Sequence, residues 1–216
     1  MVATFLVTGS ASGMGQAAAE RLRSSGHRVI GVDVKDADVV ADLSTDTGRA
    51  VAAAAVVEQC GGVLDGAVLA AGLGPIAGRD RLIVQVNYFG VVTLLTALQP
   101  ALARSGRAKV VVVSSNSTTT TPAVPRRAVR ALLDGDAERA LRAVRWFGKR
   151  SSPMIYAASK IAELSGSRVL RTSCPERPIN GEHCDTLGGR VRIPFQGFTA
   201  PLRRLRAPPF YSGVLR

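Results

Sequence analysis

The chain has 216 residues, a formal net charge of +12 and 46% apolar residues, which is enough to bury the core of one globular domain. It has no run of about 18 uncharged apolar residues and no basic leader, so we expect neither a membrane span nor a secretory signal. The three cysteines, Cys60, Cys174 and Cys184, form no C-x-x-C pair, which argues against a disulfide framework or a zinc site and favours a cytoplasmic setting.

The first pattern is an apolar run ending in Thr8, then closely spaced glycines, then an alanine-rich helical segment. A strand, a glycine turn and a helix in this order predict a phosphate-binding turn, because first-turn amides and the helix dipole favour a diphosphate. Glycines also let a ligand approach the backbone closely. On this evidence alone, the alternative is an ordinary loop between strand and helix.

A second strand is predicted at residues 27–33, ending in Asp33, which lies 18 residues after Gly15. A carboxylate at this position can accept hydrogen bonds from both hydroxyls of an adenosine ribose and would repel a 2′-phosphate. This favours NAD over NADP, although the nearby Lys35 weakens the preference. The alternative is a solvated loop aspartate.

The β-α alternation continues through the next 80 residues. We expect a strand at 39–43, a helix capped by Thr45 or Asp46 and running through Cys60, and a strand at 65–72. A long helix at about 79–104 carries Asn87, and a valine-rich strand follows at 109–115. This order predicts an α/β fold with a doubly wound, Rossmann-type parallel sheet and a ligand at the carboxyl ends of its strands.

Residues 116–152 interrupt the alternation and are predicted to form a helical insert, with one or two helices within 126–149. The insert is either a solvated flap or a lid facing the substrate. Its expected apolar stripe consists of Ala128, Leu132, Leu133, Ala140, Leu141, Val144 and Phe147.

A further helix begins near Pro153 and places Tyr156 and Lys160 on one face, since they are four residues apart. A phenol has a reference pKa near 10, and a nearby ammonium lowers it toward the range useful for acid-base catalysis. Ser115, at the end of the valine-rich strand, could hold a substrate oxygen beside the phenol. By itself, a Tyr-Lys pair at this spacing is common in helices.

Together these motifs resemble the short-chain dehydrogenase/reductase family over residues 1–164. The matching residues are Thr8, Gly9, Gly13, Gly15, Asp42, Leu43, Ala70, Ala71, Gly72, Val86, Asn87, Ser114, Ser115, Tyr156 and Lys160. Ala70 stands where the family's N-A-G motif has asparagine. The segments 31–33, 39–44, 69–75 and 86–90, together with the helical insert, look like the bacterial 3α-hydroxysteroid dehydrogenase/carbonyl reductase branch.

The resemblance implies roles for individual residues. Tyr156 would be the general acid/base, Lys160 would bind the nicotinamide ribose, Ser115 would position the substrate oxygen, and Asn87 would hold a water in a proton relay. The cofactor-binding residues it implies are Gly9, Ser12, Gly13, Met14, Gly15, Asp33, Asp42, Leu43, Ala71, Gly72, Tyr156 and Lys160, with no metal site.

The implied activity is NAD(H)-dependent interconversion of a secondary alcohol and a ketone, with a 3α-hydroxysteroid as one candidate substrate. The alternative is a non-catalytic NAD-binding or scaffold protein. The family often pairs through the helix bearing Tyr156, so the resemblance implies a homodimer unless the insert or the altered tail blocks that surface. Neither a membrane nor a nucleic acid is expected as a partner.

Residues 165–216 depart from the family pattern. They contain nine arginines, three acidic residues and six prolines, and show little periodicity. We expect an irregular tail and a sheet that is incomplete at its C-terminal side, and a frameshift near codon 165 would explain both. A disordered tail and a basic nucleic-acid-binding arm are the alternatives. Losing the family's last strands is expected to leave weak or absent turnover.

Overall fold

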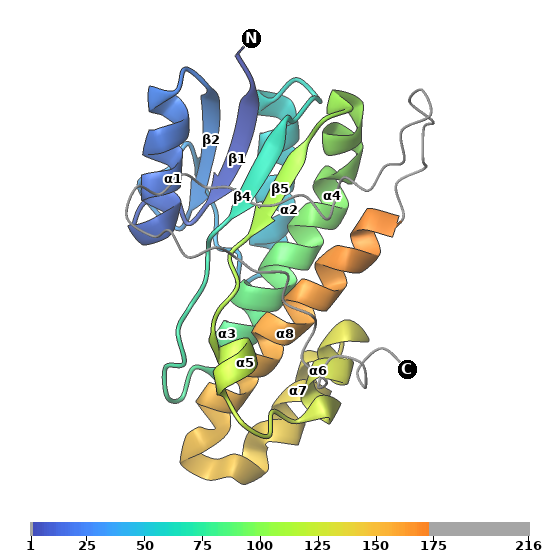
Figure 1. The fold of residues 1–216 in the computed structure, drawn as a ribbon. Helices are drawn as coiled ribbons and strands as arrows, with labels where there is room; N and C mark the ends of the chain where they lie inside the picture. Colours follow the sequence, from blue (N-terminus) through green and yellow to red (C-terminus); the bar gives the residue numbers. More distant parts are fainter. Residues whose placement is uncertain (1, 173–216) are drawn as a thin grey trace. The chain divides into compact units, whose positions relative to one another are not determined.

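The computed structural model describes residues 2–172, which fold around a parallel five-stranded sheet (Figure 1). Its strands are β1 (Thr4–Thr8), β2 (Arg28–Asp33), β3 (Val39–Val40), β4 (Gly66–Leu69) and β5 (Lys109–Val112), in the order β3-β2-β1-β4-β5. Strand order reverses after β1, so the predicted doubly wound sheet is confirmed. Because all pairs are parallel, the carboxyl ends of all five strands lie at one edge.

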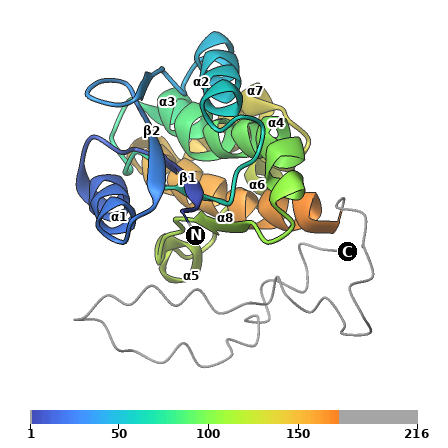
Figure 2. The ribbon, with the colours of Figure 1, turned by 90° about the horizontal axis from the view of Figure 1, so that it is seen from above.

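Helices cover both faces of the sheet. Helix α1 (Gly13–Ser24) lies on one side and α2 (Asp46–Gln59) on the other (Figure 2). Successive residues of β1 serve the two faces, since Leu6 packs in the cluster that includes Leu94 and Leu98 of α4 (Gly90–Ser105), whereas Val7 packs with Ala19 of α1. Both faces of β1 are therefore buried, which accounts for its continuous apolar sequence.

The caps of these helices follow the sequence signals. Thr45 is the N-cap of α2, and its hydroxyl accepts from the N–H of Gly48 at 3.0 Å, which decides between the two predicted caps. Gly26, just after α1, has a φ of +80°, as expected where a glycine ends a helix.

The long helix predicted at 79–104 is continuous but not uniform. It consists of α3 (Asp80–Val84), a π-helical turn η1 (Gln85–Phe89) and α4. The stretch Asp80–Ser105 is apolar and long enough to cross a membrane by length and composition. Half of the most apolar 18-residue stretch of this helix is buried inside the fold, as is typical of a core helix. Its length and composition are therefore weak evidence for a membrane span.

The insert forms α5 (Ser117–Thr120), α6 (Arg126–Leu133), α7 (Ala137–Val144) and a 3-10 turn η2 (Arg145–Arg150). Helices α6 and α7 pack on each other and on α8 (Ser151–Thr172). Four of the seven predicted stripe residues are buried, and Leu141 is half-buried. The prediction was wrong for Leu133 and Phe147, which are both 37% exposed: Leu133 is the last residue of α6, and Phe147 lies in η2, beyond the end of α7.

Helix α8 passes the predicted boundary between domain and tail. It runs to Thr172, eight residues beyond Leu164, so the irregular tail does not begin at residue 165. The remaining tail, including Cys174 and Cys184, lies outside the described residues. The frameshift hypothesis and the prediction of an incomplete C-terminal side of the sheet concern those residues, so both stay predictions.

Candidate active site

The turn after β1 brings three backbone segments into close contact. Gly9 adopts a left-handed backbone with a φ of +71°, and its N–H donates to the carbonyl of Val32 at 2.9 Å. A Cβ on Gly9 would lie 2.9 Å from the backbone nitrogen of Ala71, and one on Gly15 would lie 2.6 Å from the carbonyl carbon of Gly9. Both positions require glycine because the chain after β1, the chain after β4 and the start of α1 meet there.

The start of α1 is open above this turn. Ser12 is the N-cap in extended backbone, and its side chain accepts no capping hydrogen bond. Ser12, Gly13 and Met14 are exposed, and a Cβ on Gly13 would meet no other described residue within 4 Å apart from its chain neighbours and its own helix. Within residues 2–172, the buried hydroxyl of Ser10 has no hydrogen-bond partner. Free first-turn amides beside an unpartnered hydroxyl fit a bound diphosphate.

Asp33 ends β2 beside the same turn. One carboxylate oxygen accepts from the N–H of Ala11 at 3.0 Å, and the other accepts from the N–H of Val34 at 2.7 Å. The half-exposed carboxylate is therefore fixed where β1 and β2 both end, and each oxygen retains lone-pair capacity for a ligand hydroxyl.

Asp42 and Leu43 follow β3 and have different surroundings. Asp42 is exposed and accepts from the N–H of Ser44 at 2.9 Å, whereas the Leu43 side chain is buried in the core. The buried Arg49 guanidinium donates to the Leu43 carbonyl at 2.8 Å and to the Gln85 side chain at 3.3 Å. Arg49, which the sequence analysis missed, thus ties this loop to η1.

Asn87 lies within the π-helical turn and is fully buried. Its amide nitrogen donates to the Leu73 carbonyl at 2.9 Å, and its amide oxygen accepts from the Leu73 N–H at 2.8 Å. The same oxygen would lie 3.4 Å from a Cβ on Gly72. Asn87 therefore fixes the backbone of the segment that follows β4, next to the small residues Ala70–Gly72.

Asn87→Ala is expected to lower the free energy of unfolding by about 2 kcal/mol, because two hydrogen bonds are lost and two Leu73 backbone groups lose their partner. Urea denaturation measures the change. The matched control is Asn116→Ala, since Asn116 is exposed and its side chain makes no capping hydrogen bond. Equal stability of the two variants would contradict this assignment.

Lys160 sits on α8 with its ammonium buried at the end of β5. The ammonium donates to the carbonyl of Val113, the residue directly after β5, at 2.8 Å. It would lie 3.8 Å from a Cβ on Gly72, and it forms an ion pair with the buried Glu163 at 2.9 Å. The structure thus brings Lys160, Asn87 and Gly72 together, although they are far apart in sequence.

Tyr156 and Ser115 lie near this group in the fold but are not joined to each other. Tyr156 is half-exposed, one turn before Lys160 on α8, and Ser115 is half-exposed, two residues beyond Val113. The Ser115 hydroxyl accepts from the N–H of Ser117 at 3.2 Å. Among the described residues, no hydrogen bond links the Tyr156 hydroxyl to Ser115, so their catalytic pairing stays a prediction.

Glu163 is a second residue that the sequence analysis missed. Burial raises the pKa of its carboxyl to about 7, while the adjacent Lys160 ammonium acts in the opposite direction. The available signal was an acidic residue three positions after Lys160, in a helical segment whose other residues are mostly apolar or small.

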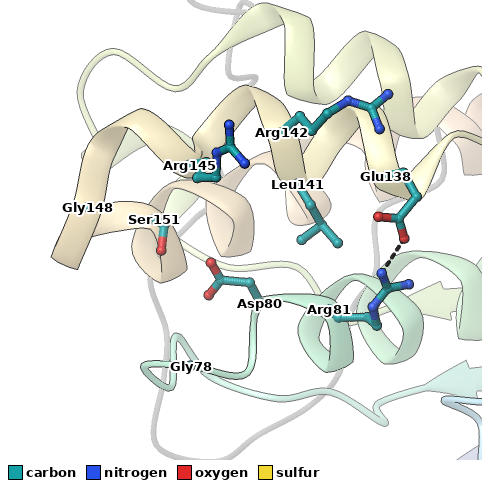
Figure 3. Close-up of a pocket in the computed structure, with 9 residues that line it drawn as sticks. All are labelled: Gly78, Asp80, Arg81, Glu138, Leu141, Arg142, Arg145, Gly148 and Ser151. Carbon is teal, nitrogen blue, oxygen red and sulfur yellow. Dashed lines mark ion pairs between the residues drawn. The ribbon is translucent and has the colours of Figure 1, made fainter.

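One cavity of about 530 Å³ lies between α3, α7, η2 and the start of α8 (Figure 3). Asp80 accepts a hydrogen bond from Ser152 beside it, and Arg81 forms an ion pair with Glu138 across it. None of the predicted catalytic residues lines this cavity, so it does not establish the insert as a substrate lid. Residues 2–172 contain no group of three potential metal ligands.

Comparison with known proteins gives consistent matches. The family model "short chain dehydrogenase" matches residues 3–125. A 3-alpha-hydroxysteroid dehydrogenase/carbonyl reductase of Comamonas testosteroni is 38% identical over 157 residues, covering 73% of this chain and 61% of its own length. A crystal structure of a 3-alpha-hydroxysteroid dehydrogenase from Pseudomonas sp. B-0831 complexed with NADH is 44% identical, with a TM-score of 0.70, covering 77% of this chain and 65% of that one.

A short-chain dehydrogenase from Streptomyces avermitilis shares the fold at 23% identity, with a TM-score of 0.58 and coverage of 79% of this chain and 60% of that chain. The chain thus spans less than two thirds of the length of these relatives. The family match covers more than half of the chain, and the glycine turn, Asn87 and Ser115 lie within the matched residues. On this evidence, the chain belongs to the short-chain dehydrogenase family.

Proposed function

We propose that this protein is an NAD(H)-dependent oxidoreductase that interconverts a secondary alcohol and a ketone. The observation that carries the proposal is the buried Lys160 ammonium, held beside Gly72 and Asn87 where β4 and β5 end, one helical turn from Tyr156. In sheets of this architecture, ligands bind at the carboxyl ends of the parallel strands, and a group of titratable side chains there is typical of a functional site.

The residues present fit a dinucleotide. The close approach of Gly9 and Gly15 to neighbouring backbone, the open first turn of α1 and the unpartnered Ser10 hydroxyl suit a diphosphate. Asp33 would hold the adenosine ribose, and Lys160 the nicotinamide ribose. When bound, the nicotinamide supplies or accepts the hydride.

The protein's own residues would handle the oxygen and the proton. Tyr156 would donate a proton to the ketone oxygen, or accept one from the alcohol, while the Ser115 hydroxyl holds that oxygen in place. The Asn87 amide gives one N–H and one lone pair to Leu73, so its second N–H and the carbonyls of the π-turn are the groups that would hold a water in the proton relay.

We also propose that the substrate is a bulky secondary alcohol or ketone, with a 3α-hydroxysteroid as the first candidate. Two relatives named as 3-alpha-hydroxysteroid dehydrogenases are 38% and 44% identical to this chain. The proposal includes a cytoplasmic location and a homodimer.

Titration of the full-length chain with NADH, followed by mixing with a 3-ketosteroid in a single-turnover experiment, tests the function. We expect saturable binding and loss of NADH absorbance after the ketone is added. Failure to bind NADH would exclude the proposal, while binding without oxidation of NADH by any of a panel of ketones would favour a non-catalytic NAD-binding role.

Asp33→Asn is expected to raise the ratio of NADPH affinity to NADH affinity by roughly tenfold, since the change removes a negative charge that repels a 2′-phosphate. Fluorescence titration with both nucleotides measures the ratio. Asp36→Asn is the matched control because Asp36 is exposed on the same loop. An unchanged ratio in Asp33→Asn would place the ribose away from β2.

A further inference from the structure

Glu163 is a buried acid that the proposed chemistry leaves without a role. It is 0% exposed, one helical turn after Lys160, and one of its carboxylate oxygens lies 2.9 Å from the Lys160 ammonium. Neither carboxylate oxygen has a hydrogen-bond partner among the described residues, so the contact with Lys160 is an ion pair. A carboxylate is rarely kept in such a place unless its charge partner is also fixed there.

The ammonium of Lys160 is held from two sides. The Val113 carbonyl at 2.8 Å accepts one N–H, and a Glu163 carboxylate oxygen lies 2.9 Å from the same nitrogen as an ion pair. An ammonium has three N–H donors, and the single hydrogen bond to Val113 leaves donors for a ligand. Lysine side chains are flexible, and a single backbone acceptor would leave the long stem of Lys160 poorly restrained.

We infer that Glu163 is a positioning residue for Lys160: its carboxylate, sealed inside the fold, holds the ammonium at the end of β5 with one N–H directed to the nicotinamide ribose. The inference rests on the proposed function, because the ribose is its expected ligand. It assigns a task to a side chain outside the Asn87, Ser115, Tyr156 and Lys160 set.

Other charged groups on the elements that contact α8 are placed differently. The charged side chains of α4, α6, α7 and η2, and Arg81 of α3, are exposed. Asp80 of α3 accepts from a serine at the start of α8. Burial raises the pKa of Tyr88 in η1 to about 12, so it stays neutral at physiological pH. The charge that acts on Glu163 is that of Lys160.

The main test compares the full-length chain with Glu163→Gln, which keeps the shape of the side chain and removes its charge. We expect the NADH dissociation constant to rise about tenfold at pH 8, because a charge-assisted contact is lost. The control, Ser165→Ala, removes a hydroxyl that bonds the Ile161 carbonyl on the same helix, and is expected to change NADH affinity less than twofold.

A pH series separates positioning from packing. In the wild type, NADH affinity should fall as pH drops through about 7, where Glu163 becomes protonated, whereas the affinity of Glu163→Gln should lack this step. If the variant binds NADH within twofold of wild type at pH 8, or keeps the step, the inference is wrong.

A double-mutant cycle on stability keeps the test decisive if wild type binds no NADH. Glu163→Gln, Lys160→Met and the double variant are unfolded in urea. A coupling of at least fivefold in the unfolding equilibrium constant would support the contact even though the proposed function had failed, and a coupling below twofold would overturn the positioning role.

Discussion

Tyr156→Phe is expected to lower the single-turnover rate of NADH oxidation by a ketone by roughly 10²–10⁴-fold, the range typical of a lost general acid. NADH affinity is expected to stay within about twofold. Tyr156 is half-exposed and its hydroxyl makes no hydrogen bond among the described residues, so its removal is expected to leave the fold unchanged. Stopped-flow absorbance gives the rate even where steady-state turnover is slow, and fluorescence titration gives the affinity.

Tyr88→Phe is the matched control, since it makes the same chemical change at a tyrosine buried in η1. Its single-turnover rate is expected to equal that of wild type. If Tyr156→Phe also reacts at the wild-type rate, the proton is transferred by another group. If wild type binds NADH but transfers no hydride, the result supports the alternative of a non-catalytic NAD-binding or scaffold protein.

The architecture was predictable because local signals and sheet topology agree. Alternating strands and helices, with glycines at the turns, predicted the parallel sheet that the structure confirms. The strand ends were less predictable. β3 pairs only through Val39 and Val40, since it lies at the sheet edge and Asp42 then turns the chain by accepting from Ser44. The predicted strand at 39–43 is therefore three residues too long.

The parts of the site that sequence could not predict depend on tertiary contacts. The π-turn at Asn87 coincides with its paired hydrogen bonds to Leu73, 14 residues away, which helical periodicity does not reveal. The burial of Glu163 depends on how α8 packs against neighbouring helices. The motif residues, by contrast, were predictable because each occupies a position fixed by a strand end or a helix turn.

Gly15→Ala is expected to lower the free energy of unfolding by about 3 kcal/mol, the upper part of the range for overpacking. The new Cβ would lie 2.6 Å from the Gly9 carbonyl carbon and 2.9 Å from the Thr8 carbonyl oxygen. Both are backbone atoms of the turn, so they cannot rotate away as a side chain would. Helix α1 would have to move off the turn, and NADH affinity is expected to fall with it.

Helix propensity predicts the opposite result, since alanine in a helix is favoured over glycine by about 1 kcal/mol. Gly15 lies in α1 with an ordinary helical backbone, so only the contact with the turn opposes the change. Gly74→Ala is the control, because within residues 2–172 only its chain neighbours come within 4 Å of its would-be Cβ, and its φ is not positive. A urea midpoint for Gly15→Ala at or above that of wild type would mean that α1 does not pack on the turn, and the diphosphate site would lose its structural basis.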